Sequence, residues 1–409
     1  MIAMYKKLGL IFSILFLDFF SFSAVIAFLP LFFLSTPHSF FSESFSPNLR
    51  YILLGMLSAT YPIAQVIAAP LLGHLSDKIG RRGILQYSYL GNTLGYLLCS
   101  IGILTTSILP LFIGNFVAGL MGVNLSTTNA IISDVSVSEK RSKFFAVSHL
   151  MLGIGFILGP FVAGKIVTYS PHVFDACFYL FLACAIFSFF NFLLIYFFWT
   201  PDEDKMVSAK PTEILWKELF SCNREVKILL FAEFLIFFGW YFFIKSFQVF
   251  LIEGIQCSEA QVFNVYSQYG LWFALSQVVF ITWLHRYSKS EKFFRHFITF
   301  LALSIFILYF AKSFWAACLI VPLFTFAYGM LIPSLTGLVS DYATSHNNGK
   351  VMGLHQSIQA FAKIGGPLIA GCVLTLTPMA TVLLSPLFIF ASRAVFALRE
   401  KEKKIPEVT

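Results

Sequence analysis

The polar stretch Gly73-His-Leu-Ser-Asp77-Lys-Ile-Gly80-Arg81-Arg82-Gly83 joins two long apolar runs, at about residues 50–74 and 84–105. Each run is long enough to cross a bilayer, because a membrane-spanning helix needs about 20 mostly apolar residues. The glycines permit a tight turn between closely packed helices. The carboxylate and the arginines can form charge-assisted hydrogen bonds at the membrane surface. The stretch therefore predicts a short polar turn between two membrane-spanning helices.

The same alternation of apolar runs and polar breaks continues along the 409 residues. Of these residues 58% are hydrophobic and only 12% are charged, whereas about a quarter of a soluble domain is charged. This composition excludes a water-soluble globular fold, and it also excludes intrinsic disorder. The apolar runs lie at about 8–34, 50–74, 84–105, 108–133, 144–168, 174–199, 227–252, 261–284, 294–312, 314–340, 350–376 and 379–398. We predict an all-α membrane protein with twelve transmembrane helices.

Basic residues are distributed unevenly around these runs. The amino terminus, alternate loops and the carboxy terminus together hold 22 of the 28 Lys and Arg residues. Such an asymmetry marks the cytoplasmic side of a membrane protein. Both termini are therefore predicted to be cytoplasmic, in a multi-pass protein of a bacterial inner membrane. Since topology explains the net charge of +8, no nucleic-acid partner is expected.

The second half of the chain repeats features of the first. Gly122 corresponds to Gly329 and Asp134 to Asp341, each pair being 207 residues apart. Several matches at one offset indicate a duplicated six-helix unit, and parallel repeats of this kind enclose a substrate cavity at mid-membrane. We predict an N-terminal six-helix bundle over 1–199, a cytoplasmic linker over 200–225 and a C-terminal six-helix bundle over 226–409.

The stretch Gly73–Gly83 resembles motif A, G-x-L-a-D-r-x-G-r-r, of the major facilitator superfamily. The resemblance implies the fold of that family, two six-helix bundles that rock to give alternating access. It also implies an inner gate whose charged bonds hold one conformation until substrate or proton shifts the balance. The predicted gate residues are Gly73, Asp77, Gly80, Arg81 and Arg82, with Asp134 and Asp341 as partners.

A second stretch, Gly155-Phe-Ile-Leu-Gly159-Pro160-Phe-Val-Ala-Gly164, is similar to motif C, which marks twelve-span proton antiporters of that superfamily. Its small residues allow two helices to approach closely, and its proline bends the helix. Helix packing alone is the simpler interpretation of such a motif. The resemblance adds antiport as an expected function.

The stretch Ile113–Asp134 looks like the tetracycline-efflux branch, and Asp18 falls where that branch has a buried aspartate. One position departs from the branch. Its fourth span carries an Arg tied to proton transfer, whereas this chain has Asn115 there. An amide supplies no positive charge, so the usual coupling network is altered or absent.

Charged side chains inside the membrane cost about 2.5–3.5 kcal/mol each, even on insertion scales, so each needs a reason. Asp18 and Glu233 are predicted to carry the coupling proton; the alternative is that the acids pair with lysines and hold the halves together. Lys245 and Lys363 could neutralise an anionic substrate or replace the missing Arg, and Lys245 could instead reach the outer interface.

Several polar and aromatic residues fall within the predicted spans. Such a lining suits a moderately sized organic solute, although ordinary hydrogen bonding between helices explains any single one. The candidates for a substrate cavity are Gln65, Asn115, Asn124, Trp240, Gln248, Gln359 and Lys363.

These features predict proton-coupled efflux of a small organic solute, either a drug-like amphiphile or an exported metabolite such as a siderophore. Proton-coupled import of a nutrient and a non-transporting membrane sensor are the alternatives. No catalytic cluster, phosphate-binding loop or metal-ligand spacing occurs, so we expect no enzyme activity, metal or cofactor besides the proton. The expected partners are the substrate and membrane lipid, and a monomer is expected.

Overall fold

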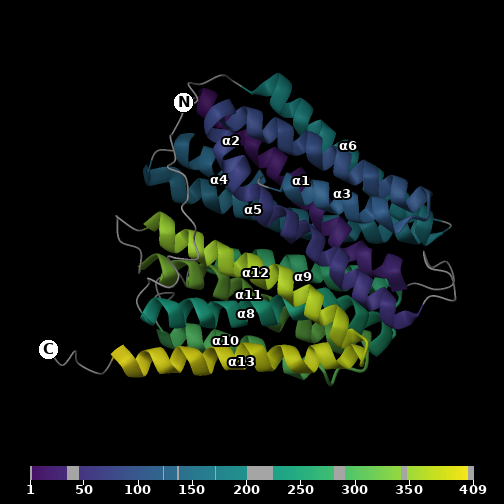
Figure 1. Ribbon diagram of the computed structural model, residues 1–409, viewed down its shortest axis with the longest axis vertical. Helices are drawn as coiled ribbons and strands as arrows, with labels where there is room; N and C mark the ends of the chain where they lie inside the picture. The colour runs from purple at the N-terminus through teal and green to yellow at the C-terminus, as the bar shows by residue number, and fades with distance from the viewer. Residues whose placement is uncertain are drawn as a thin grey trace. The chain divides into compact units, whose positions relative to one another are not determined.

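A computed structural model describes residues 2–34, 46–122, 124–135, 138–170, 172–199, 224–280, 291–341 and 348–403. Every regular element in this part is a helix (Figure 1), which confirms the predicted all-helical fold. The elements are α1 (Ile2–Leu34), α2 (Pro47–Leu104), α3 (Ile108–Leu120), α4 (Asn124–Val135), α5 (Ser138–Tyr169), α6 (Val173–Phe198), α8 (Arg224–Val249), the π-helix η1 (Phe250–Gly254), α9 (Glu259–Val279), α10 (Glu291–Leu308), α11 (Phe314–Asp341), α12 (Asn348–Leu374) and α13 (Pro378–Lys403).

Eight segments of the described helices are long and apolar enough to cross a membrane. They are Tyr5–Ala27, Pro47–Ala68, Leu150–Tyr169, Phe174–Phe198, Arg224–Gly254, Phe314–Thr336, Leu354–Leu374 and Pro378–Ala397. Two further apolar helices, Ile108–Leu120 and Phe293–Leu308, are shorter. The structure thus contains the elements of a polytopic membrane protein, while the count of twelve spans stays a prediction.

The predicted polar turn lies inside α2. Its backbone is helical on both sides of Gly80, which has φ 77° and ψ 167°. That region of backbone conformation is open to glycine and costly for other residues. Gly80 therefore divides α2 into two helices, as the sequence predicts for this stretch.

The predicted span at 108–133 is wrong as a single helix. α3 ends at Leu120, and α4 begins at Asn124. At the break the side-chain amide of Gln65, from α2, donates to the carbonyl oxygen of Gly122 at 2.5 Å. This bond gives the Gly122 carbonyl, which lies between α3 and α4, a partner from another helix, and Gly and Asn are both poor helix formers. A bond from a neighbouring helix thus replaces helical bonding at this point.

The described residues group into two compact units. Unit 1 comprises those within Met1–Pro211 together with Ser258–Ala274, and unit 2 comprises those within Thr212–Cys257 together with Leu275–Thr409. The first part of α9 thus groups with unit 1, whereas the predicted C-terminal bundle would contain all of α9. The linker lies outside the described residues except for Arg224 and Glu225. The predicted domain boundaries stay a prediction.

In unit 1, the motif C helix α5 packs closely on α1 (Figure 1). The hydroxyl of Ser23 donates to the carbonyl oxygen of Gly155 at 2.9 Å. A Cβ atom at Gly155 would lie 2.8 Å from the backbone nitrogen of Phe20, and one at Gly159 would lie 2.5 Å from the Phe20 carbonyl oxygen. Glycine is therefore required where these two backbones meet.

Unit 2 repeats this packing between α8 and α12. Gly366, which is 207 residues after Gly159, lies against the backbone of α8. A Cβ atom there would come within 2.8 Å of the Phe242 nitrogen and 2.9 Å of the Tyr241 carbonyl carbon. The duplicated pattern in the sequence thus corresponds to a duplicated helix contact.

A second contact also occurs in both units. In unit 1 the Gln65 amide donates to the Gly122 carbonyl oxygen. In unit 2 the Gln277 amide, from α9, donates to the Gly329 carbonyl oxygen at 2.9 Å. Gly122 and Gly329 are equivalent in the repeat, and each carbonyl accepts from a glutamine of a neighbouring helix.

Candidate functional site

Asp18 lies in α1 and is half-buried. The side-chain amide of Asn124, the first residue of α4, donates to Asp18 Oδ1 at 3.2 Å. Asn124 is buried, and its own Oδ1 has no hydrogen-bond partner among the described residues. No basic side chain in the described part of the chain forms an ion pair with Asp18. The structure therefore brings together a predicted proton carrier and a predicted cavity residue.

Asn115, the residue in place of the expected arginine, is not bonded to Asp18. Its amide donates to the carbonyl oxygen of Leu111 at 3.0 Å and approaches Cys99 Sγ of α2 at 3.7 Å. The Gln65 amide likewise donates to a backbone carbonyl oxygen, that of Gly122. Hydrogen bonding within and between helices accounts for both side chains, and their role in a substrate cavity stays a prediction.

Glu233 lies in α8, inside unit 2, with none of its surface exposed. Its Oε1 atom lies 2.5 Å from Nδ1 of His355 in α12, and His355 is also buried. Removing a carboxylate from water is costly unless it gains a partner. The imidazole is the partner that the fold supplies, so neither predicted proton carrier pairs with a lysine among the described residues.

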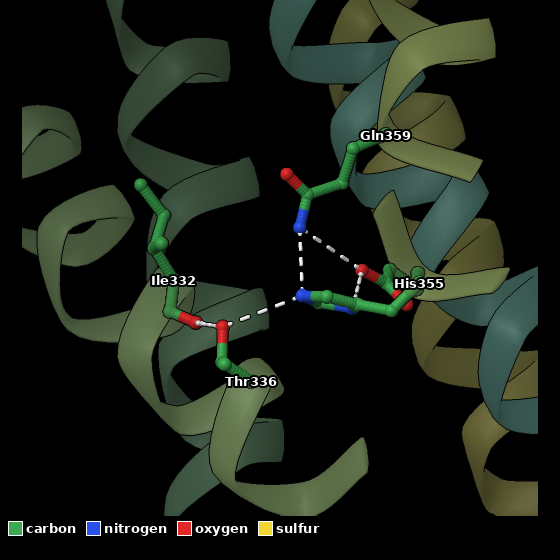
Figure 2. A network of polar contacts seen from close by, with 5 residues as sticks. Ile332, Thr336, His355 and Gln359 are labelled. Carbon is green, nitrogen blue, oxygen red and sulfur yellow. Dashed lines mark hydrogen bonds and ion pairs between the residues drawn. The ribbon is translucent and has the colours of Figure 1, made fainter. Parts of the chain in front are cut away.

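Two more side chains complete this network, which Figure 2 shows. Gln359, one turn beyond His355 in α12, places Nε2 at 2.9 Å from His355 Nε2 and 3.5 Å from Glu233 Oε1. Thr336 of α11 places Oγ1 at 3.4 Å from His355 Nε2 and donates to the carbonyl oxygen of Ile332 at 3.1 Å. Glu233 Oε2 has no hydrogen-bond partner among the described residues.

His355 and Thr336 are not among the residues predicted from the sequence. One signal was present: His355, Gln359 and Lys363 recur every fourth residue in α12, and residues at this spacing share one face of a helix. Pairing that face with Glu233 requires knowledge of which helix packs against α12, because the two residues are far apart in the sequence.

Lys363 continues the same face of α12. Its Nζ lies 5.9 Å from the ring centroid of Tyr241 in α8, within the range of a cation–π contact. In the part of the chain that the structure describes, Lys363 forms no ion pair with a carboxylate. A cation here would attract an anionic group, so its predicted role toward an anionic substrate stays open to test.

Trp240 and Gln248 are buried within unit 2. The Trp240 ring stacks on Tyr328 with 3.7 Å between ring centroids. This packing gives Trp240 a structural role in the core of the unit. For both residues, the predicted contact with substrate stays a prediction.

The predicted inner gate is only partly described. Arg82 donates from Nη2 to the carbonyl oxygen of Tyr196 in α6 at 2.9 Å, and Arg81 is half-buried nearby in the sequence. The side chains of Asp77, Asp134 and Asp341 lie outside the described part, and so do the surroundings of Gly73. Their charged contacts across a gate therefore stay a prediction.

Long apolar helices that enclose ionisable groups, with a duplicated packing pattern, define a membrane transport protein. The model of the Major Facilitator Superfamily matches residues 11–367, and the chain belongs to that superfamily. This is a family of transporters, and the chain is a transporter rather than an enzyme.

Similar proteins include several named for drug resistance. The tetracycline resistance protein, class D, of Salmonella ordonez is 27% identical over 331 residues, which cover 79% of this chain and 80% of the relative. The class H protein of Pasteurella multocida is 37% identical over 132 residues, but this match spans only 32% of either chain. The quinolone resistance protein NorA of Staphylococcus aureus (strain Mu50 / ATCC 700699) is 23% identical over 322 residues, 78% of this chain and 80% of the relative.

Solved structures share the fold at low identity. The human organic anion transporter MFSD10 (TETRAN) has a TM-score of 0.68 at 19% identity, with 96% of this chain and 99% of the other covered. A POT family transporter in complex with 5-aminolevulinic acid has a TM-score of 0.74 at 13% identity, covering 97% and 96%. These likenesses establish the fold alone.

Proposed function

We propose that this transporter exports a small organic solute from a bacterial cell in exchange for protons. The chain crosses the inner membrane twelve times with both termini in the cytoplasm, and it needs no metal or cofactor besides the proton. The uneven placement of basic residues supports this topology. The resistance proteins to which the chain is similar support export and a drug-like amphiphile as the first substrate class to test.

The observation that carries the proposal is the environment of Asp18. This carboxylate lies within a membrane-spanning segment and is bonded to a neutral amide, with no ion-pair partner among the described residues. Burial disfavours the charged form of a carboxylate, while the amide hydrogen bond favours it. Two opposing effects of this kind allow the group to exist with or without its proton.

A carboxylate in this situation can couple two movements. When Asp18 binds a proton on the side of higher proton concentration, the neutral group passes through the conformational change at little cost. When it releases the proton into the cytoplasm, the charged form can favour the state that accepts the solute. Each state then has a different affinity for proton and solute, which is the thermodynamic requirement for coupling.

The variant Asp18→Asn is expected to abolish solute-driven proton movement in everted membrane vesicles. Asparagine keeps the size and the hydrogen-bonding capacity of the side chain but has no ionisable proton. A pH-sensitive dye would report the collapse of a preformed proton gradient when tetracycline, a quinolone, an amphiphilic cation or an organic carboxylate is added. We expect the wild type to give a dye response. The variant should give only the background response of vesicles without the protein.

Asp175→Asn provides the matched control, because Asp175 lies in the first turn of α6 rather than in the middle of a span. It should retain proton movement. A wild-type response that survives in Asp18→Asn would refute the assignment of Asp18. Solute uptake into whole cells, instead of export, would establish an importing symporter.

A further inference from the structure

The buried network around Glu233 contains two ionisable groups that no other described charge neutralises. Among the side chains that the structure describes, the helices packed around it carry these other ionisable residues: Arg224, Glu225, Lys227, Tyr241 and Lys245 of α8, Cys318 and Tyr328 of α11, Lys363 and Cys372 of α12, and Arg393 of α13. None of these forms an ion pair or hydrogen bond with Glu233 or His355. Among the described residues, the imidazole is therefore the titratable partner of this carboxylate.

The hydrogen bond of Thr336 restricts what this side chain can do toward His355. A hydroxyl group has one hydrogen, and that of Thr336 is donated to the carbonyl oxygen of Ile332. While this bond to Ile332 is made, Thr336 can only accept toward His355 Nε2. Its contact with the ring is satisfied when Nε2 carries a hydrogen.

The amide of Gln359 makes the opposite demand. Its Nε2 group carries only donors, and it lies 2.9 Å from His355 Nε2. This contact is satisfied when the ring nitrogen has a free lone pair. The remaining ring hydrogen then lies on Nδ1, the ring nitrogen that lies 2.5 Å from Glu233 Oε1. The two neighbours of one ring nitrogen thus suit two different protonation states of the ring (Figure 2).

We propose that Glu233 and His355 form one proton-binding site in unit 2, with Gln359 donating to the empty site and Thr336 accepting from the loaded one. In the empty site an ionised Glu233 accepts from the Nδ1 hydrogen of a neutral His355, and the pair carries one negative charge. A proton from water then adds to Nε2, and the pair becomes an imidazolium beside a carboxylate with no net charge. One O–H bond of a hydronium ion breaks as the N–H bond at Nε2 forms, and a water molecule is left; no other bond changes.

The Gln359 side chain must respond to loading. Once Nε2 carries a hydrogen, the amide nitrogen faces a second donor, so this contact is broken and the amide turns away from the ring. Thr336 needs no such change. Loading therefore favours a rearranged α12 face, and this site deepens the proposed function by adding a second proton-binding position to that of Asp18.

The site can be tested without any transported solute. We suggest purified protein with ¹⁵N-labelled histidine in lipid nanodiscs, followed by NMR as the pH is varied, together with infrared spectroscopy of the carboxyl groups. The chain has eight histidines, and the variant His355→Asn identifies the signal of His355. Exposed His296 of α10 is the internal reference.

The expected result is one shared transition. The His355 signal and a carboxyl band that is absent in Glu233→Gln should change at the same pH, and Glu233→Gln should move the His355 transition but not that of His296. Thr336→Val removes the acceptor for the loaded ring, and Gln359→Leu removes the donor to the empty ring. These two variants should therefore move the midpoint in opposite directions.

Separate transitions for the two groups, or shifts of the same sign in Thr336→Val and Gln359→Leu, would overturn the proposal. The Thr336 and Gln359 variants keep both ionisable groups, so the test survives if Glu233→Gln fails to fold. Asp18→Asn should leave the transition unchanged. A failure of Asp18-dependent transport would therefore contradict the proposed function and leave this site standing.

Discussion

Replacing His355 by alanine should destabilise the protein by roughly 3–5 kcal/mol, because it leaves the buried Glu233 carboxylate without its partner. Glu233 is fully buried, and His355 is its partner at 2.5 Å. With the imidazole gone, only the Gln359 amide at 3.5 Å remains near that oxygen. Thermal unfolding of the purified protein in detergent, monitored by the loss of monodisperse protein after heating, would measure the effect.

A second substitution should restore most of the stability that His355→Ala removes. In the double variant Glu233→Gln, His355→Ala the buried group is a neutral amide, which costs far less to bury than a charge. His296→Ala is the matched control, since His296 is exposed and substitutions at such positions usually change stability by less than about 0.5 kcal/mol. Equal stability of His355→Ala and His296→Ala would show that the buried pair contributes nothing.

Two adjacent glycines should respond in opposite ways to alanine. A Cβ atom at Gly366 meets the backbone of α8 at 2.8–2.9 Å, whereas one at Gly365 meets only the Phe238 ring, at an ordinary 3.4 Å. Gly366→Ala forces two helix backbones apart, and overpacking of this kind typically costs about 1–3 kcal/mol. Gly365→Ala should be neutral or stabilising, because alanine is favoured over glycine in a helix by up to about 1 kcal/mol.

The same thermal assay compares the two variants directly. Both changes add one methyl group at neighbouring positions of α12. The effect of replacing glycine by alanine in a helix is therefore the same in both variants, and only the contact with α8 differs. A similar midpoint for both would contradict the close approach of α8 and α12 at Gly366. Transport activity of Gly365→Ala should equal that of the wild type.

Much of the helical framework can be predicted from the sequence, because apolar runs and glycine spacing are local signals. Gly80 at the turn in α2 and Gly159 at the α1–α5 contact lie where their sequence context indicates. The break between α3 and α4 was not predicted, because it involves a bond from Gln65, a residue of another helix. An apolar run carries no information about such a partner.

The candidate sites divide in the same way. Asp18, Asn124, Glu233 and Gln359 could each be selected from the sequence, because a polar side chain inside an apolar run is conspicuous. Their pairing could not be predicted, since it depends on which helices pack together and on how far each residue lies along its helix axis. His355 lies near the polar start of its run, so its burial became evident only from the packing of α12 on α8.

The glutamine–glycine bond occurs in both halves of the chain. It ends at equivalent glycines, Gly122 and Gly329, so each half fastens a neighbouring helix to the same backbone carbonyl. The partners of the acids differ: the position equivalent to Asn124 is Leu331, and the position equivalent to His355 is Ser148. The two halves therefore share this helix contact, whereas each surrounds its buried carboxylate with different side chains.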